Sequence, residues 1–245
     1  MEGFKLVGEV YIPERQSCPA LCLCHGIPRG IPDPSDRGYT LLAERFSKAG
    51  FATLIFNFRG TGDSGGDFDI MGWTRDLESA IDYLYNMREV DRDKISLMGF
   101  SGGAAVSVYV AAKDHRVSSL MVCACPTEFH LTADPDRARF AIEHFRNIGI
   151  IRDENFPVSV ADWMDGFNKV KPIEQVENIS PRPLLIIHGA HDDVVDPSGA
   201  WALYDRAGEP KEILIIDGAG HRLRLEEGAI DGALNWLNSQ AFCGH

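Results

Sequence analysis

Residues 94–106 read KISLMGFSGGAAV, and this short stretch decides the fold class of the chain. An apolar run typical of a buried strand leads into GFSGG, whose serine is Ser101, and a helix-forming run follows directly. A strand that enters a helix through Gly-x-Ser-x-Gly makes a turn so tight that glycines must surround it, and the serine hydroxyl stands exposed above the sheet. The stretch therefore predicts an α/β fold in which Ser101 is a nucleophile.

Short apolar runs alternate with amphipathic stretches along the rest of the chain. The predicted strands cover residues 4–13, 20–26, 51–60, 94–101, 117–126, 182–190 and 211–220, and the predicted helices lie near 37–48, 73–89, 102–113, 198–207 and 225–239. The five strands between residues 20 and 190 are apolar along their length, as a parallel sheet covered by helices on both faces requires. The first strand alternates more, so we expect it at an antiparallel edge. We predict a single α/β domain over residues 1–245.

One segment interrupts this alternation. Residues 127–181 separate two predicted strands where a single helix would suffice. An insertion of this length in a compact domain is usually a lid or a binding element, so residues 127–181 are predicted to form a small lid. Its helical pattern has an apolar side, which packing onto the body explains more readily than substrate contact. That side consists of Phe140, Ile142, Phe145 and Ile148.

A serine hydroxyl needs a general base within hydrogen-bond reach, and that base needs an orienting acid. In an α/β sheet these residues must follow the carboxyl ends of parallel strands. Asp192 and Asp193 follow one predicted strand, and His221 follows the last one. The order Ser101, Asp192, His221 is the nucleophile, acid and base order expected for this type of sheet. Asp193 stays open as an alternative acid.

Acyl transfer also requires hydrogen-bond donors for the oxyanion. The backbone amide of Ile27, in the loop CHGIPRG, and the amide of Gly102 are predicted to supply them. His25, in the same loop, is interpreted as a structural hydrogen-bonding residue, since a second base has no task.

Five motifs, HG, FNFRGTGDSGG, GFSGG, HGAHDDVVDP and GAGH, stand in the order and at the spacing of an α/β-hydrolase, which the chain resembles over nearly its whole length. The set is most similar to small serine esterases and aminopeptidase-like hydrolases, including cinnamoyl or feruloyl esterases. The resemblance implies that Asp192 is the acid and that carboxylic esters of small molecules are cleaved through an acyl-enzyme. In relatives a proline directly follows the two valines, whereas here Asp196 intervenes before Pro197.

Several alternatives stay open at this stage. An amidase, a peptidase or a thioesterase would use the same three residues, and a ligand-binding protein could keep the fold without turnover. Aromatic residues are predicted to contact an apolar or aromatic acyl group: Phe100, Phe129, Phe140 and Trp163. No metal or organic cofactor is expected. One cluster could suggest a metal site, but the catalytic triad explains these positions better: His188, His191, Asp192 and Asp193.

Composition narrows the partners and the location. A formal net charge of −12 argues against a nucleic-acid surface, which needs clustered Lys and Arg. The N-terminus lacks the features of a secretory signal, and no apolar run reaches the length of a spanning helix, so a cytoplasmic protein is expected.

The spacing of Cys22 with Cys24 and of Cys123 with Cys125 predicts that each pair points to one face of the sheet as small buried residues. A homodimer through the sheet edge or the lid is one open alternative.

Overall fold

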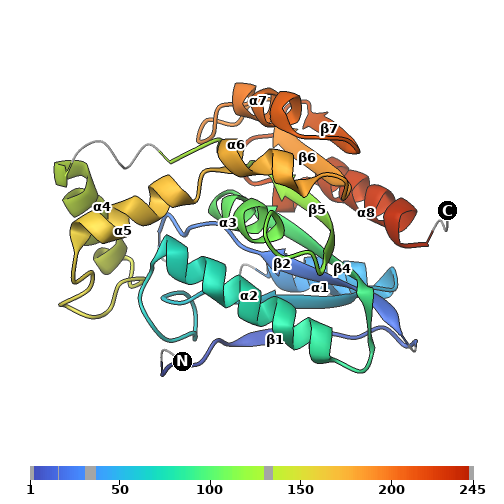
Figure 1. Cartoon of the computed structure of the whole chain (residues 1–245), viewed down its shortest axis with the longest axis horizontal. Coiled ribbons are helices and arrows are strands. Elements are labelled where there is room, and N and C mark those ends of the chain that lie inside the picture. The colour runs from blue at the N-terminus through green and yellow to red at the C-terminus, as the bar shows by residue number, and fades with distance from the viewer. Residues whose placement is uncertain (1–2, 16, 31–36, 130–134, 243–245) are drawn as a thin grey trace.

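The computed structural model describes residues 3–15, 17–30, 37–129 and 135–242, and its centre is a seven-stranded sheet (Figure 1). The strands run in the order β1-β3-β2-β4-β5-β6-β7. Their bounds are β1 Gly8–Tyr11, β2 Cys18–Cys24, β3 Ala52–Phe56, β4 Val90–Phe100, β5 Val117–Cys123, β6 Leu184–Gly189 and β7 Lys211–Ile216. Only β1 is antiparallel to its neighbour, β3, and the other pairs are parallel. The predicted antiparallel edge strand is confirmed.

Helices cover both faces of the sheet (Figure 1). One face packs against α2 (Ile70–Asn86), α3 (Gly102–Ala111) and α7 (Ser198–Arg206), and the other against α1 (Gly38–Lys48) and α8 (Glu227–Phe242). Side chains alternate between the two layers along each strand, and all seven residues of β2 are buried. Burial on both faces explains why the central strands are apolar throughout rather than alternating. The predicted fold class, a mostly parallel sheet between two helical layers, is confirmed.

The cysteine prediction holds for one pair and is wrong for the other. Cys22 and Cys24 lie on the same face of β2, and both thiols are buried. Cys123 is the last residue of β5, and the chain then turns through Ala124, whose φ is 50°. Because the strand has ended, Cys125 packs in the opposite layer from Cys123.

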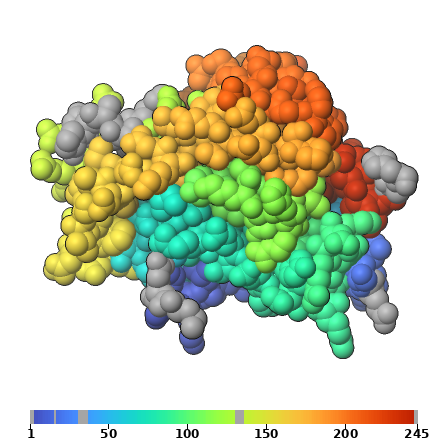
Figure 2. Space-filling view, in the orientation of Figure 1, coloured from blue at the N-terminus to red at the C-terminus, as the bar shows by residue number. Residues whose placement is uncertain are grey.

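The segment predicted as a lid contains three helices and a 3-10 turn: α4 (Pro135–Asn147), α5 (Val160–Lys169), α6 (Pro172–Gln175) and η1 (Val176–Ile179). Residues 130–134 of that segment lie outside the described residues. The loop before α5 and the helix itself form one end of the molecule, shown in yellow in Figure 2. Within the described ranges, no helix combines the length and the hydrophobicity needed to cross a bilayer.

Candidate active site

The candidate site lies where four strands of the sheet end. Ser101 directly follows β4, and Ile27 lies in the loop after β2, the neighbouring strand. Asp192 follows β6 and His221 follows β7, which pair with each other in parallel. Parallel strands place their carboxyl ends on one edge of a sheet, so the topology brings together residues that lie far apart in the chain.

The turn at Ser101 is held by close backbone packing. Ser101 has a φ of 54°, a conformation that non-glycine residues rarely adopt, and its amide donates to the Cys123 carbonyl over 2.8 Å. A Cβ at Gly103 would lie 2.3 Å from the His25 carbonyl oxygen, and one at Gly99 would lie 2.5 Å from the Cα of Ala104. Both contacts are with backbone atoms, so the two glycines are steric requirements of the turn.

Ser101, His221 and Asp192 form a hydrogen-bonded chain. The carboxylate of Asp192 only accepts, so His221 Nδ1 carries the proton that it donates to Oδ2 over 2.9 Å. The other ring nitrogen, Nε2, then accepts the Ser101 hydroxyl proton over 3.0 Å. This is the arrangement in which an imidazole can remove a proton from a serine.

Asp192 is held in its ionised form. Burial of its carboxylate acts to raise the pKa, but the amides of Val195 and Val194 and the His221 ring donate hydrogen bonds that lower it below the usual value. The two amides lie 3.0 and 2.9 Å from Oδ1. Asp193, the alternative acid, is exposed, and the described structure gives it no contact with His221.

The end of β6 packs directly on the loop that carries His221. A Cβ at Gly189 would lie 2.5 Å from the carbonyl oxygens of Ala219 and Gly220. The amide of His191 donates to the Ala219 carbonyl over 2.8 Å. These contacts explain how the acid and the base meet although Asp196 displaces the proline of the family pattern.

The two predicted oxyanion donors lie side by side. A Cβ placed on Gly102 would lie 3.4 Å from the Ile27 nitrogen and 2.6 Å from its Cγ1. Gly102 is the first residue of α3, so its N–H has no partner within the helix. In the described part of the chain, neither amide donates a hydrogen bond to another residue. Both N–H groups can therefore serve an oxygen of a bound substrate.

His25 orients the first of these donors. The Phe58 amide donates to His25 Nε2 over 3.2 Å, so the ring proton is on Nδ1, which donates to the Gly26 carbonyl over 2.8 Å. The C=O and N–H of a trans peptide point in opposite directions, so the bond to Gly26 turns the Ile27 N–H away from His25. Burial lowers the pKa of His25 and keeps the ring neutral. The structure thus gives His25 the hydrogen-bonding contacts expected from the sequence.

The predicted substrate-contacting aromatics occupy different environments. Phe100 is buried and packs edge-to-face on Tyr39, and Phe129 packs edge-to-face on Phe167. Trp163 is buried, and its indole N–H donates to the Phe68 carbonyl over 3.0 Å. Phe140 is 75% exposed. Substrate contact by these residues stays a prediction.

The structure also brings forward residues that sequence reasoning did not single out. Thr61 Oγ1 lies 3.1 Å from His25 Nε2. His188, weighed in the sequence only as part of a metal cluster, is buried beside Asp192. In the sequence, the signal that could have identified His188 is a histidine within an otherwise apolar predicted strand. Across the described ranges, no group of three or more His, Cys, Asp or Glu side chains is placed to hold a metal ion.

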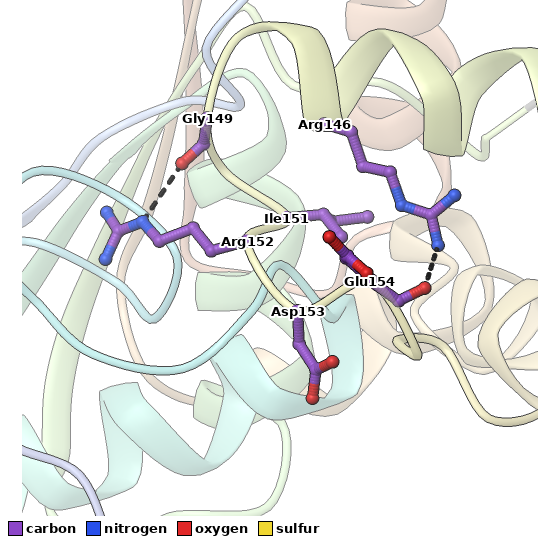
Figure 3. Close-up of a pocket in the computed structure, with 6 residues that line it drawn as sticks. All are labelled: Arg146, Gly149, Ile151, Arg152, Asp153 and Glu154. Atoms are coloured by element: carbon purple, nitrogen blue, oxygen red, sulfur yellow. Dashed lines mark hydrogen bonds between the residues drawn. The ribbon is translucent and has the colours of Figure 1, made fainter.

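A hollow of about 380 Å³ lies in the predicted lid, lined by Arg146, Gly149, Ile151, Arg152, Asp153 and Glu154 (Figure 3). The two arginine side chains extend to opposite sides of it (Figure 3). Arg146 donates to the Glu154 carbonyl and Arg152 to the Gly149 carbonyl, over 3.0 and 3.1 Å. Both guanidinium groups therefore stabilise the local backbone conformation through hydrogen bonds to its carbonyls.

Comparison with solved structures identifies the fold. The α/β-hydrolase GrgF from Penicillium sp. sh18 aligns with a TM-score of 0.76 at 21% identity, covering 98% of this chain and 96% of its own. Est1E from Butyrivibrio proteoclasticus, which has also been solved with ferulic acid bound, aligns with a TM-score of 0.72 at 19% identity over 98% and 96% of the two chains. The protein has the α/β-hydrolase fold, as the motifs predicted.

The sequence then identifies the family. The model of the prolyl oligopeptidase family matches residues 39–239, and the chain belongs to this family. The polyketide transferase ATR5 of Stachybotrys chlorohalonatus is 27% identical, with 90% of this chain and 87% of the relative aligned. An uncharacterised protein of Pseudomonas aeruginosa is 24% identical, with 89% and 72% aligned.

Proposed function

We propose that the protein is a serine hydrolase that cleaves carboxylic esters of small molecules through an acyl-enzyme intermediate. The observation that carries the proposal is the hydrogen-bonded chain from Ser101 through His221 to Asp192, beside two amides that have no partner among the described residues. Membership of a hydrolase family and likeness to Est1E support it.

In the first half of the reaction, Ser101 Oγ attacks the ester carbonyl carbon while His221 Nε2 takes the hydroxyl proton. The carbonyl oxygen becomes an oxyanion and accepts hydrogen bonds from the amides of Ile27 and Gly102. The C–O bond to the alcohol then breaks, and the imidazolium of His221 returns the proton to the leaving oxygen. Asp192 stabilises the imidazolium between these two proton transfers.

In the second half, water takes the place of the alcohol. His221 removes a proton from the water as it attacks the acyl carbon, and the same two amides hold the second oxyanion. Collapse of this intermediate breaks the bond to Ser101 Oγ, and His221 gives the proton back to the serine. The acid leaves and the enzyme is regenerated.

The test is hydrolysis of p-nitrophenyl esters from acetyl to decanoyl, a cinnamoyl ester and a p-nitroanilide. We expect turnover of at least one ester, and a loss of several powers of ten in kcat for Ser101→Ala and for His221→Ala. Two surface variants are matched controls, Ser79→Ala on α2 and His115→Ala after α3, both at exposed positions, and these should keep the wild-type rate. Turnover that survives in Ser101→Ala, or turnover of the anilide alone, would contradict the ester proposal.

A second candidate is acyl transfer to an acceptor other than water. The likeness to a polyketide transferase over 90% of this chain favours it. Both reactions share the acyl-enzyme and differ in the second nucleophile. Product analysis with an added alcohol distinguishes them, because a transferase forms the new ester at the expense of the free acid.

A further inference from the structure

His188 is a buried polar residue that the proposed reaction does not use. It is the fifth of the six residues of β6, and its side chain has no solvent exposure. Ile186 and Leu184, two and four residues earlier, lie in the apolar layer on the same face of the strand. Packing alone would favour another aliphatic residue at this position, because a buried ring nitrogen without a partner destabilises the fold.

The proton on the His188 ring can be assigned from its contacts. Nε2 lies 3.0 Å from the Val195 carbonyl oxygen, which can only accept, so Nε2 carries the proton. Nδ1 is buried and has no hydrogen-bond partner among the described residues. A second proton there would add a buried charge and an unpaired donor. His188 is therefore neutral, with its N–H directed at the loop that carries Asp192.

This contact closes the acid loop around the carboxylate. Val195 accepts from His188 through its carbonyl and donates to Asp192 Oδ1 through its amide, over 3.0 Å in each case. The same His188 N–H lies 3.2 Å from Asp192 Oδ2. His221 Nδ1 lies 2.9 Å from this oxygen and 3.1 Å from Oδ1. Both oxygens of Asp192 thus lie beside fixed N–H groups. The backbone amides of Val194 and Val195 are at Oδ1, and the His188 ring N–H is at Oδ2.

We infer that His188 is a positioning residue for the acid of the triad, an inference that rests on the proposed function. It holds Val195 in place and presents an N–H beside Oδ2, so that the carboxylate keeps the orientation in which both of its oxygens lie within hydrogen-bond distance of His221 Nδ1. Among the described residues, Asp192 is the titratable group that the structure places in contact with His188.

The test compares two substitutions at this position. His188→Leu removes the N–H and keeps an apolar side chain, whereas His188→Gln keeps an amide N–H at the end of a side chain of similar reach. His191→Gln is the matched control, since His191 lies in the same loop with an exposed side chain. For the leucine variant we expect kcat for p-nitrophenyl acetate to fall about tenfold to a hundredfold, with KM little changed. The glutamine variant should recover part of the loss, and the control should match the wild type.

Two further readouts separate positioning from packing. If Asp192 moves away from His221, the imidazolium loses stabilisation and its pKa falls, so the acid limb of kcat/KM against pH moves to lower pH in His188→Leu. The deshielded proton shared by His221 and Asp192, seen by proton NMR, should weaken or shift in the same variant. A leucine variant that melts earlier while its acid limb and this proton stay unchanged would overturn the inference. The NMR signal needs no substrate, so the inference fails or stands separately from the ester proposal.

Discussion

Ser101 adopts a φ of 54°, which raises its energy relative to an ordinary backbone conformation. The surrounding structure maintains it through the hydrogen bond to Cys123 and through the glycines that admit the turn. In return, the hydroxyl stands at the end of β4 within 3.0 Å of the His221 ring. The sequence predicts the turn at Ser101 because the glycine pattern that permits it is local.

The ring of His25 is not expected to touch the substrate, yet its substitution should change the reaction rate. His25→Phe removes the N–H that orients the Gly26 carbonyl, so the Ile27 amide loses its fixed direction. We expect kcat for an ester substrate to fall about a hundredfold, the order found when one oxyanion donor is lost, with a smaller change in KM. Steady-state kinetics on p-nitrophenyl acetate measures both.

The control for that prediction is His25→Asn, whose amide N–H lies near the position of Nδ1 and can still reach the Gly26 carbonyl. This variant should retain more activity than His25→Phe. Phe58 and Trp73 pack edge-to-face on the His25 ring, with ring centroids 5.1 and 5.3 Å away. Equal activities in the two variants would show that the ring acts through this packing and not through its N–H.

Among the helices, α4 buries a different side from the one that the sequence predicted. The apolar pattern suggested a side that includes Phe140, but Phe140 is 75% exposed, and Ala138 and Ala141 are buried with Ile142 and Phe145. The two alanines are small enough to let the helix pack closely against the body. The apolar pattern treated Phe140 and the alanines alike as hydrophobic, so it could not predict that the alanines face inward and Phe140 outward. Packing against α5 and Phe68 decides the orientation, and these neighbours are distant in the sequence.

The connection between the predicted lid and the body depends on Arg152. Its guanidinium donates to the carbonyls of Ser64, Gly60 and Gly62 over 2.9, 3.1 and 2.9 Å, in the loop that contains Thr61. Arg152→Gln should lower the free energy of unfolding by about 1–3 kcal/mol, because several carbonyls lose a charged donor. Urea denaturation measures the change.

Arg139→Gln on α4 is the matched control for Arg152. Arg139 pairs with Asp136 at the surface, where the side chains of the pair are 73% and 86% exposed, so the expected change is within about 0.5 kcal/mol. Arg152→Lys tests the geometry, since an ammonium group cannot reach the same set of carbonyls with a planar fork. A lysine variant as stable as the wild type would show that charge alone holds the loop.

At the scale of the whole molecule, Asp192 links global stability to pH. Its pKa is lowered in the folded state, so its ionised form stabilises the fold above the unfolded value of about 3.9, and this contribution is lost as the pH falls through the lower folded value. Asp192→Asn lacks the contribution. We therefore expect the variant to be less stable than the wild type near neutral pH, and the difference to shrink as the pH falls below the unfolded value.

Urea unfolding at several pH values measures this difference. Asp193→Asn is the control, because its side chain is exposed and its substitution should change stability little at any pH. A stability difference for Asp192→Asn that stays constant from neutral to acid pH would show that the carboxylate contributes through packing rather than through its charge.

Local sequence patterns are sufficient to predict the class of the sheet, its antiparallel edge and the candidate site residues Ser101, His221, Ile27 and Gly102. These depend on local patterns: apolar runs, glycines at a tight turn, and polar residues directly after strands. The sequence left two neighbouring carboxylates open, and it did not single out His188 or Arg152. The contact of Asp192 with His221, and that of His188 with the loop that carries Asp192, could not be predicted from the sequence, because both depend on how the ends of β6 and β7 pack together.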